Sequence, residues 1–119
     1  SRYQNRNNVA LAKIAESQAE LDRRQAEKDL YTKIETAWHN ATTRQAQEVA
    51  SKTARDNAKL AYELAQKKYE FGNLTNTELL VSRNTYLNAE QTYLQNKYMV
   101  LLYQQLLNFY QGKEIIINN

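Results

Sequence analysis

The segment Lys68-Tyr69-Glu70-Phe71-Gly72-Asn73-Leu74-Thr75-Asn76-Thr77-Glu78 contains one of only two glycines among the 119 residues and is the natural place for this chain to reverse. The other is Gly112, and proline is absent. Glycine and proline are the residues that most disfavour a helix interior. The sequence therefore predicts a single all-α hairpin, with helices over about residues 6–70 and 76–111, a turn at about 71–75 and an irregular tail at about 112–119.

The chemistry of this segment predicts a tight reversal. Gly72 follows Phe71 at the position where a left-handed residue ends a helix. Thr75 and Glu78 have the spacing of a capping box, in which the Thr hydroxyl accepts an amide hydrogen and the Glu carboxylate reaches back. Leu74 and Leu79 flank this box as a hydrophobic staple would. We expect one helix to end and a second to begin within these few residues.

Apolar residues recur every seven positions beyond the turn, which keeps them on one helix face with a mild supercoil. Alanines at alternating spacings of four and three precede the turn, and we expect the leucine column to pack against them. A second apolar column runs beside the first, and together they form an apolar stripe that is wider than packing against one partner helix requires. The leucine column is Leu80, Leu87, Leu94 and Leu101; the second column is Leu79, Tyr86, Tyr93, Val100 and Leu107; the alanines are Ala54, Ala58, Ala61 and Ala65.

The two predicted helices differ in length. The second, of about 36 residues, covers only a similar length of the first, so about 30 upstream residues, some 45 Å of helix, have no hairpin partner. That upstream part still carries apolar side chains, which something else has to cover. We therefore expect a fragment of a larger assembly or one subunit of an oligomer. The upstream apolar residues are Val9, Leu11, Ile14, Leu21, Leu30 and Ile34.

Composition disfavours several classes of function. The net charge of +3 is spread along the chain, and charges such as Glu20 and Arg24 pair on one helix turn, which is typical of a solvated face and not of a nucleic-acid groove. The chain has no cysteine, and its one histidine, His39, lacks the convergent ligands of a metal site. No nucleophile, phosphate-loop or cofactor motif is present. We expect no enzyme activity, no cofactor and no nucleic-acid partner.

The pattern around the turn resembles the TolC-like outer-membrane efflux proteins, whose C-terminal helical repeat has an A-Y…A…(K/R)-Y…G turn and then a leucine-heptad helix. The likeness covers nearly the whole chain, and the spacing between its two glycines is the most specific part. The residues that carry it are Ala61, Tyr62, Ala65, Lys68, Tyr69, Gly72, Thr75, Glu78, Leu79, Leu80, Tyr86, Leu87, Ala89, Leu94, Tyr98, Leu106, Tyr110 and Gly112.

This resemblance implies that the chain is part of a homotrimeric α-helical barrel lying in the periplasm, below an outer-membrane β-barrel that the chain does not contain. Proteins of this kind are passive exit ducts for efflux or protein secretion. They dock to a periplasmic adaptor (membrane fusion) protein and an inner-membrane transporter. Asn118 and Asn119 would then begin the equatorial strand region.

The resemblance also assigns roles at the turn. Tyr69 matches a tyrosine used in helix–helix bonds near the constriction, and Glu78 matches an acidic position that lines it. Leu74 and Val81 stand where family members can carry an arginine and a second acid. The implied constriction is therefore a single acidic ring from Glu78 with apolar tip contacts. The implied adaptor-docking tip is Phe71, Gly72, Asn73, Leu74, Thr75 and Asn76.

Two roles for Glu78 are open and compatible, a helix cap and a pore-lining acid. The alternative function for the whole chain is a soluble coiled-coil binding module, such as an adaptor hairpin or a cytosolic scaffold. An adaptor is disfavoured because its two arms tend to have similar length.

Overall fold

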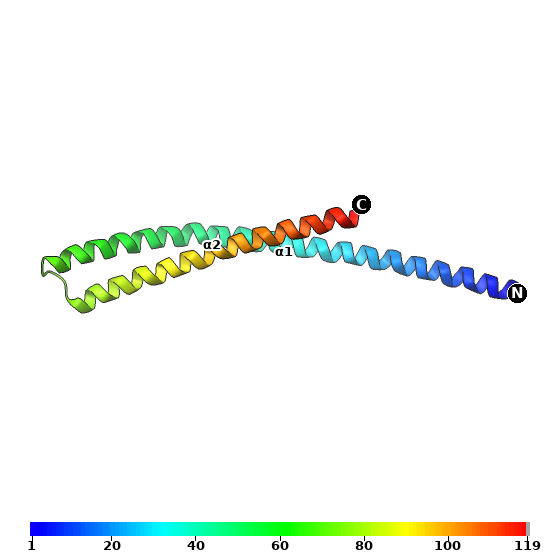
Figure 1. Ribbon diagram of the computed structural model, residues 1–119, viewed down its shortest axis with the longest axis horizontal. Coiled ribbons are helices and arrows are strands. Elements are labelled where there is room, and N and C mark those ends of the chain that lie inside the picture. Colours follow the sequence, from blue (N-terminus) through cyan, green and yellow to red (C-terminus); the bar gives the residue numbers. More distant parts are fainter. Residues whose placement is uncertain (119) are drawn as a thin grey trace. The chain divides into compact units, whose positions relative to one another are not determined.

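The protein is all-α, with two helices, α1 (Arg2–Glu70) and α2 (Asn76–Asn118), joined by the turn at 71–75 (Figure 1). The structure, a computed structural model, describes residues 1–118, and the side chains of residues 1–113. The helices fall into two compact units. We call residues 37–107 the hairpin unit, and residues 1–36 with 108–119 the arm unit.

Both helices are longer than the sequence predicted. The α1 helix begins at Arg2 and not near residue 6, because the hydroxyl oxygen of Ser1 accepts a hydrogen bond from the Gln4 amide at 3.4 Å and caps the first turn. The α2 helix continues to Asn118, so the irregular tail predicted for 112–118 is wrong. One glycine at position 112 costs only about 1 kcal/mol inside a helix. Asn119 lies outside the described residues, and Asn118 is helical rather than the start of a strand.

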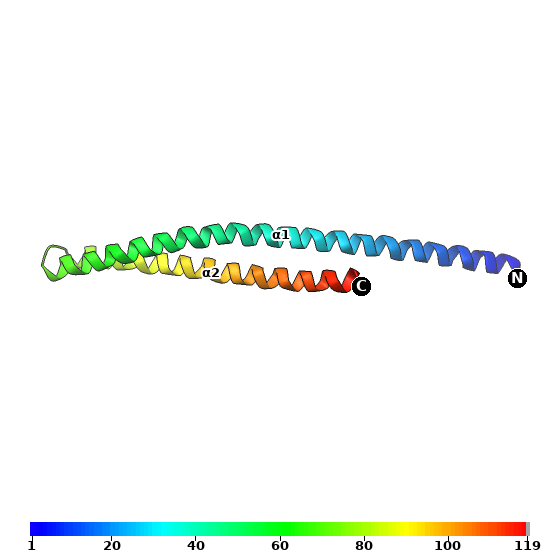
Figure 2. The same cartoon turned by 90° about the horizontal axis from the view of Figure 1, so that it is seen from above.

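In the hairpin unit the two helices run antiparallel and wind past each other: Figure 1 shows them side by side near the turn, and Figure 2 shows them side by side farther from it. Buried and half-buried residues recur on each helix at alternating spacings of three and four, which is the pattern of knobs-into-holes packing. We call these residues the seam. On α1 they are Ala37, Ala41, Arg44, Glu48, Ser51, Arg55, Ala58, Tyr62 and Ala65; on α2 they are Leu79, Ser82, Tyr86, Ala89, Tyr93, Asn96, Val100, Tyr103 and Leu107.

The seam confirms one predicted column and corrects the other. The column that begins at Leu79 faces α1, and its Val100 is 7% exposed. The leucine column, which begins at Leu80, does not pack on the alanines of α1, since its members are 37% to 47% exposed. Of the predicted alanine partners, Ala58 and Ala65 lie in the seam, whereas Ala54 and Ala61 are exposed. The two columns are offset by one residue, which is about 100° of rotation around the helix axis. Both repeat every seven residues, so the repeat alone could not show which of them faces α1.

The arm unit contains a long exposed stretch. Every residue from 1 to 26 is exposed except Glu20, including four of the six upstream apolar residues, Val9, Leu11, Ile14 and Leu21. The other two are covered: Leu30 is 7% exposed and Ile34 is half-buried. A shallow groove is lined by Leu30 and Lys33 on one side and Tyr110 on the other. The extra length of α2 therefore shortens the uncovered part of α1 to about its first 26 residues.

Candidate functional site

Two helix caps stabilise the tip of the hairpin unit, one at the end of α1 and one at the start of α2. The Asn73 amide donates to the Lys68 carbonyl at 2.8 Å, and the Gly72 amide donates to the Tyr69 carbonyl at 3.0 Å. With φ of 74° at Gly72, these two bonds form the Schellman motif that ends α1. A residue with a Cβ rarely adopts this φ, so glycine is required by the backbone itself.

The predicted capping box is present at the start of α2. The Thr75 amide donates to the Glu78 carboxylate at 3.0 Å, and the Glu78 amide donates to the Thr75 hydroxyl oxygen at 3.2 Å. Leu74 and Leu79 are both half-buried, as their place in a hydrophobic staple predicts. Glu78 itself is exposed, so its carboxylate caps the helix and also meets solvent.

The remaining tip residues present their side chains outward. Phe71 is 79% exposed and Tyr69 is 44% exposed. An exposed phenylalanine on a turn fixed by several hydrogen bonds offers a rigid apolar contact. The structure thus brings Tyr69 and the predicted docking residues 71–76 together at one end of the hairpin unit, with Glu78 in the first turn of α2.

Halfway along the seam lies a polar cluster that the sequence analysis missed. Asn96 is buried and accepts a hydrogen bond from the Arg44 guanidinium at 3.2 Å. Its side-chain amide donates to the Ser51 hydroxyl oxygen at 3.1 Å and to the Gln47 carbonyl at 3.4 Å. Every contact crosses from one helix to the other. A buried amide that finds its partners only at one alignment of two helices specifies their register.

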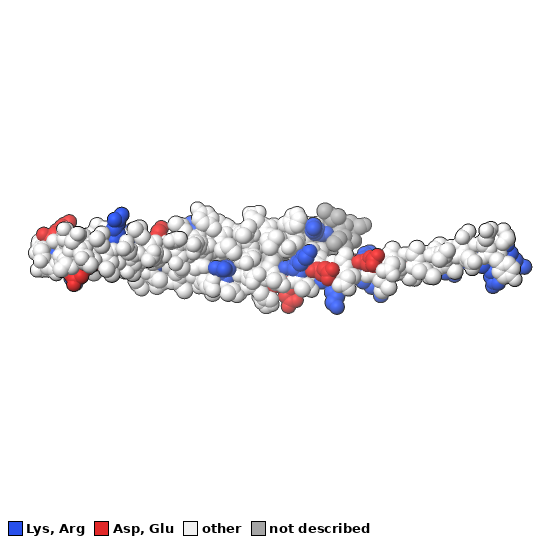
Figure 3. Space-filling view, turned by 90° about the horizontal axis from the view of Figure 1, so that it is seen from below, with Lys and Arg blue, Asp and Glu red and all other residues white. Residues whose placement is uncertain are grey.

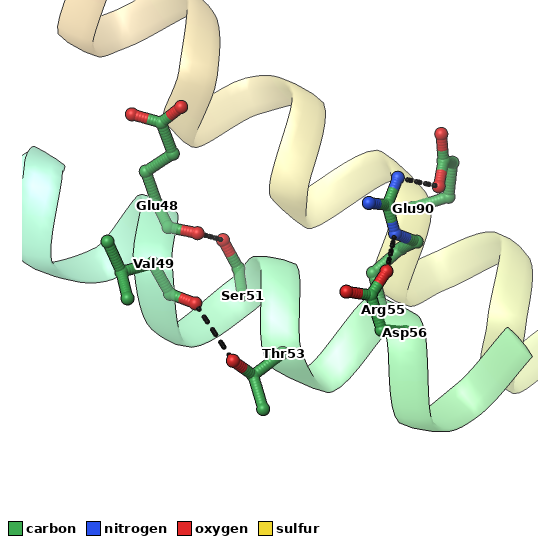
Figure 4. A network of polar contacts seen from close by, with 7 residues as sticks. All are labelled: Glu48, Val49, Ser51, Thr53, Arg55, Asp56 and Glu90. Atoms are coloured by element: carbon green, nitrogen blue, oxygen red, sulfur yellow. Dashed lines mark hydrogen bonds and ion pairs between the residues drawn. The ribbon is translucent and has the colours of Figure 1, made fainter. Parts of the chain in front are cut away.

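A second cross-helix contact is centred on Arg55 (Figure 4). Its guanidinium donates to Asp56 on the same helix at 2.7 Å and to Glu90 on α2 at 3.2 Å. It also lies over the Tyr93 ring, 4.6 Å from the centroid. The hydrogen bond to Asp56, followed by that to Glu90, raises the pKa of Arg55. The guanidinium is therefore charged at every ordinary pH, and it ties α1 to α2.

A sequence signal for these residues existed. Asn96 lies seven residues after Ala89 and seven before Tyr103, both in the seam, and Arg55 lies seven before Tyr62. Tracing residues seven positions apart, polar as well as apolar, would have placed Asn96 and Arg55 in the seam. An apolar pattern alone does not reveal Asn96 and Arg55, because it leaves out the polar members of each column.

His39 and the acidic side chains are the groups from which a metal centre in this chain would be built. His39 contacts Trp38 edge-on at 5.2 Å between ring centroids. No group of three or more His, Cys, Asp or Glu side chains in the described part of the chain is arranged to hold a metal ion. Acidic and basic side chains are interspersed over the face of the hairpin unit that Figure 3 shows, so no basic track is seen there.

Neither helix contains, within the described residues, a stretch long and apolar enough to cross a membrane. No family model matches the chain, and the searches of curated proteins and of solved structures gave no match either. The most distinctive surfaces of the hairpin unit are the exposed leucine column on α2 and the rigid tip.

Proposed function

We propose that this chain is a wall element of a TolC-like outer-membrane efflux or secretion duct, and that its turn is the periplasmic tip. The observation that carries the proposal is the leucine column, Leu80 to Leu101, which recurs at seven yet stays exposed beside a seam that is already complete. Four leucines on one line of a helix are a packing surface for a further helix. In a duct wall, every hairpin has a neighbouring helix on each side.

The function is passive in this proposal. The hairpin unit has a largely apolar seam with polar contacts at Asn96 and Arg55, and its exposed flanks offer packing surfaces to neighbouring helices. Helices packed side by side enclose a water-filled passage in a homotrimer. The passage opens when the tips rearrange on docking to a periplasmic adaptor, which links the duct to an inner-membrane transporter.

The tip is the proposed docking point. Phe71 offers an exposed ring, and the Schellman motif and capping box hold residues 71–76 in one conformation. Binding to a preformed surface avoids the entropy cost of ordering a loop. Tyr69 and Glu78 stand at the same end and are proposed to line the constriction, Glu78 as a single acidic ring.

A second candidate function is a soluble coiled-coil binding module or an adaptor hairpin, which the rigid exposed tip also suits. The lengths of the helices favour the duct, because α1 has 69 residues and α2 has 43. Two arms of similar length are the expectation for an adaptor.

The gene that encodes this chain provides the decisive test. We expect its reading frame to encode a signal peptide, amphipathic strands flanking this segment and a second copy of the hairpin pattern. We also expect the tagged product to fractionate with the outer membrane. A lipoyl-like domain flanking the hairpin, or a product in the cytosol, would contradict the duct and support the second candidate.

The pore-lining role of Glu78 can be separated from its capping role. Glutamine also completes a capping box, so Glu78→Gln removes the charge and keeps the cap. In single-channel recordings of the full-length protein we expect this variant to lose part of its cation preference, because fewer negative charges line the constriction. Thr75→Ala is the control, since it removes the cap and keeps the charge. Unchanged selectivity in Glu78→Gln would exclude Glu78 from the ring.

A further inference from the structure

The first part of the arm unit carries positive charge only. Residues 1–15 contain Arg2, Arg6 and Lys13, and the first acidic residue of the chain is Glu16. All three cations are exposed, and within the described residues none of their side chains forms a hydrogen bond or an ion pair. Figure 3 shows basic side chains and no acidic ones where α1 begins. This stretch therefore presents uncompensated positive charge to its surroundings.

The next part of the arm unit differs, because its polar groups bond with one another. Glu20 accepts hydrogen bonds from Arg23 at 2.9 Å and from Arg24 at 3.3 Å. Asp29 accepts one from the Gln25 amide at 2.9 Å. The uncompensated positive charge is therefore confined to the start of α1.

The same stretch places its largest apolar side chains on one side of the helix. Tyr3, Leu11 and Ile14 lie within an arc of about 80°, since each residue adds about 100° of rotation. They are 79%, 62% and 65% exposed. The three cations fill an arc of about 40°, which lies about 60° from the apolar arc. Cations along the edge of an apolar face are typical of a helix that lies in the surface of a membrane.

The cations also border apolar surface directly. A shallow groove on their side of α1 contains Val9 and Ala10 beside them. The aliphatic stems of arginine and lysine lie along such a surface while their charged groups reach water or phosphate. The whole stretch thus combines apolar contact with anion binding. The groove is lined by Arg2, Asn5, Arg6, Val9, Ala10 and Lys13.

A lipid surface meets both requirements at once. Its anionic phosphate groups attract the cations, and the hydrocarbon just below them takes up apolar side chains. Tyr3 suits the boundary between these two layers, because a tyrosine ring is buried there while its hydroxyl stays wet.

An acidic helix or a second copy of the chain fits less well. The cationic and apolar arcs together span about 180°, which is wider than the face that one partner helix covers. A second copy would have to neutralise the cations with its own carboxylates. Of these, Glu20 is already bonded to Arg23 and Arg24 on its own helix.

From these observations we infer that residues 2–15 bind the surface of a membrane that contains anionic phospholipids. The three cations contact the phosphate groups, and Tyr3, Leu11 and Ile14 reach the outer edge of the hydrocarbon. The inference goes beyond the proposed function and does not depend on it, since the arm unit alone carries it. The binding is reversible, because three charges and a few apolar side chains give far less affinity than a spanning helix.

Co-sedimentation of the full chain with vesicles tests the inference. We expect binding to vesicles made of equal parts of phosphatidylcholine and phosphatidylglycerol, and binding about a hundredfold weaker to phosphatidylcholine alone. Added salt should release the chain from the anionic vesicles, because it screens the attraction. A chain that stays in solution with anionic vesicles at low salt, or that binds both kinds of vesicle equally, would overturn the inference.

Replacing the three cations of the arm unit by glutamine identifies the site. This variant should bind the anionic vesicles about a hundredfold more weakly, because each cation near such a surface contributes about fivefold. The matched control combines Lys52→Gln, Lys59→Gln and Lys67→Gln, which are exposed in the hairpin unit, and it lowers the net charge equally. The control should bind like the unmodified chain. Equal loss in both variants would assign the binding to net charge and overturn the inference.

The apolar arc separates a lipid surface from an acidic protein. Leu11→Gln combined with Ile14→Gln should weaken binding to the anionic vesicles about tenfold and leave binding to soluble poly-glutamate unchanged, because only the lipid offers hydrocarbon. The control, Leu60→Gln with Leu64→Gln, changes exposed leucines of the hairpin unit and should leave vesicle binding unchanged. Vesicle binding that survives loss of Leu11 and Ile14 would point to charge alone, as on an acidic protein, and would overturn the inference.

All the substituted positions are exposed, and glutamine is a good helix former, so circular dichroism should show unchanged helicity in every variant. The outcome is separate from the test of the proposed function. A gene without duct features would contradict the duct and leave a lipid-binding arm. A chain that stays free of anionic vesicles, from a gene with every duct feature, would overturn the lipid contact alone.

Discussion

The arm unit and the hairpin unit share the helix α1, yet the same kinds of residue behave differently in each. Val9 in the arm unit is 55% exposed, and Val100 in the hairpin unit is 7% exposed. In both, the valine belongs to a helix with apolar residues at helical spacing. The difference is that a facing helix covers Val100, whereas no helix in the described part of the chain covers Val9. Burial along such a helix is set by the length of its partner and not by the local sequence.

Charged side chains show the same difference. In the arm unit, Glu20 pairs with Arg23 at 2.9 Å and Arg24 at 3.3 Å, all on one helix. The hydrogen bond from Arg23 is the main cause of a lowered pKa at Glu20. In the hairpin unit, Arg55 pairs with Glu90 across the two helices, and both side chains are partly shielded from solvent. Pairs within one exposed helix add little stability, whereas pairs across a seam also fix the alignment.

The largest contrast should come from placing a charge at the two valines. We expect Val100→Asp to reduce the free energy of unfolding by about 3 kcal/mol, because it puts an unpaired carboxylate in the seam. Val9→Asp should change it by less than about 0.5 kcal/mol, as exposed substitutions do. Urea denaturation followed by circular dichroism measures both. Equal effects would show that Val9 is covered in solution.

Asparagine gives a second, smaller contrast. We expect Asn96→Ala to cost about 2 kcal/mol, because it leaves Arg44 and Ser51 without their partner in the seam. Asn8→Ala in the arm unit should be neutral or slightly stabilising, since Asn8 is exposed and alanine is the better helix former. The same denaturation experiment compares them. A neutral Asn96→Ala would mean that this polar cluster does not stabilise the hairpin.

The two glycines provide the smallest contrast, with opposite signs. Gly72→Ala should cost about 1 kcal/mol, because alanine at a φ of 74° is strained. Gly112→Ala should stabilise α2 by about 0.5 to 1 kcal/mol, since it lies inside the helix and an added Cβ meets nothing within 4 Å. Thermal unfolding of the two variants measures both signs. A stabilising Gly72→Ala would contradict the Schellman geometry at the tip.

Much of the fold could be predicted because its signals are local. The capping box at Thr75 and Glu78 and the left-handed Gly72 depend on residues within a few positions of each other, and both were predicted and are confirmed. The end of α2 was predicted seven residues too early, because a single glycine was treated as a stop and its small cost is outweighed by helix formation on either side. The predicted roles of Phe71, Tyr69 and Glu78 in docking and gating depend on partners and stay predictions.

Local signals in the sequence were enough to predict two long helices, the position and type of the turn, and the period of seven along α2. The packing of the two helices was needed to show which of two neighbouring columns faces α1, that Asn96 and Arg55 lie in the seam, and that the leucine column stays exposed. A seven-residue repeat keeps every column of a helix equally straight, so the repeat alone does not select the column that faces the partner. The choice among columns is made by contacts such as Tyr62 on Tyr86 and Asn96 on Ser51, which join residues far apart in the chain.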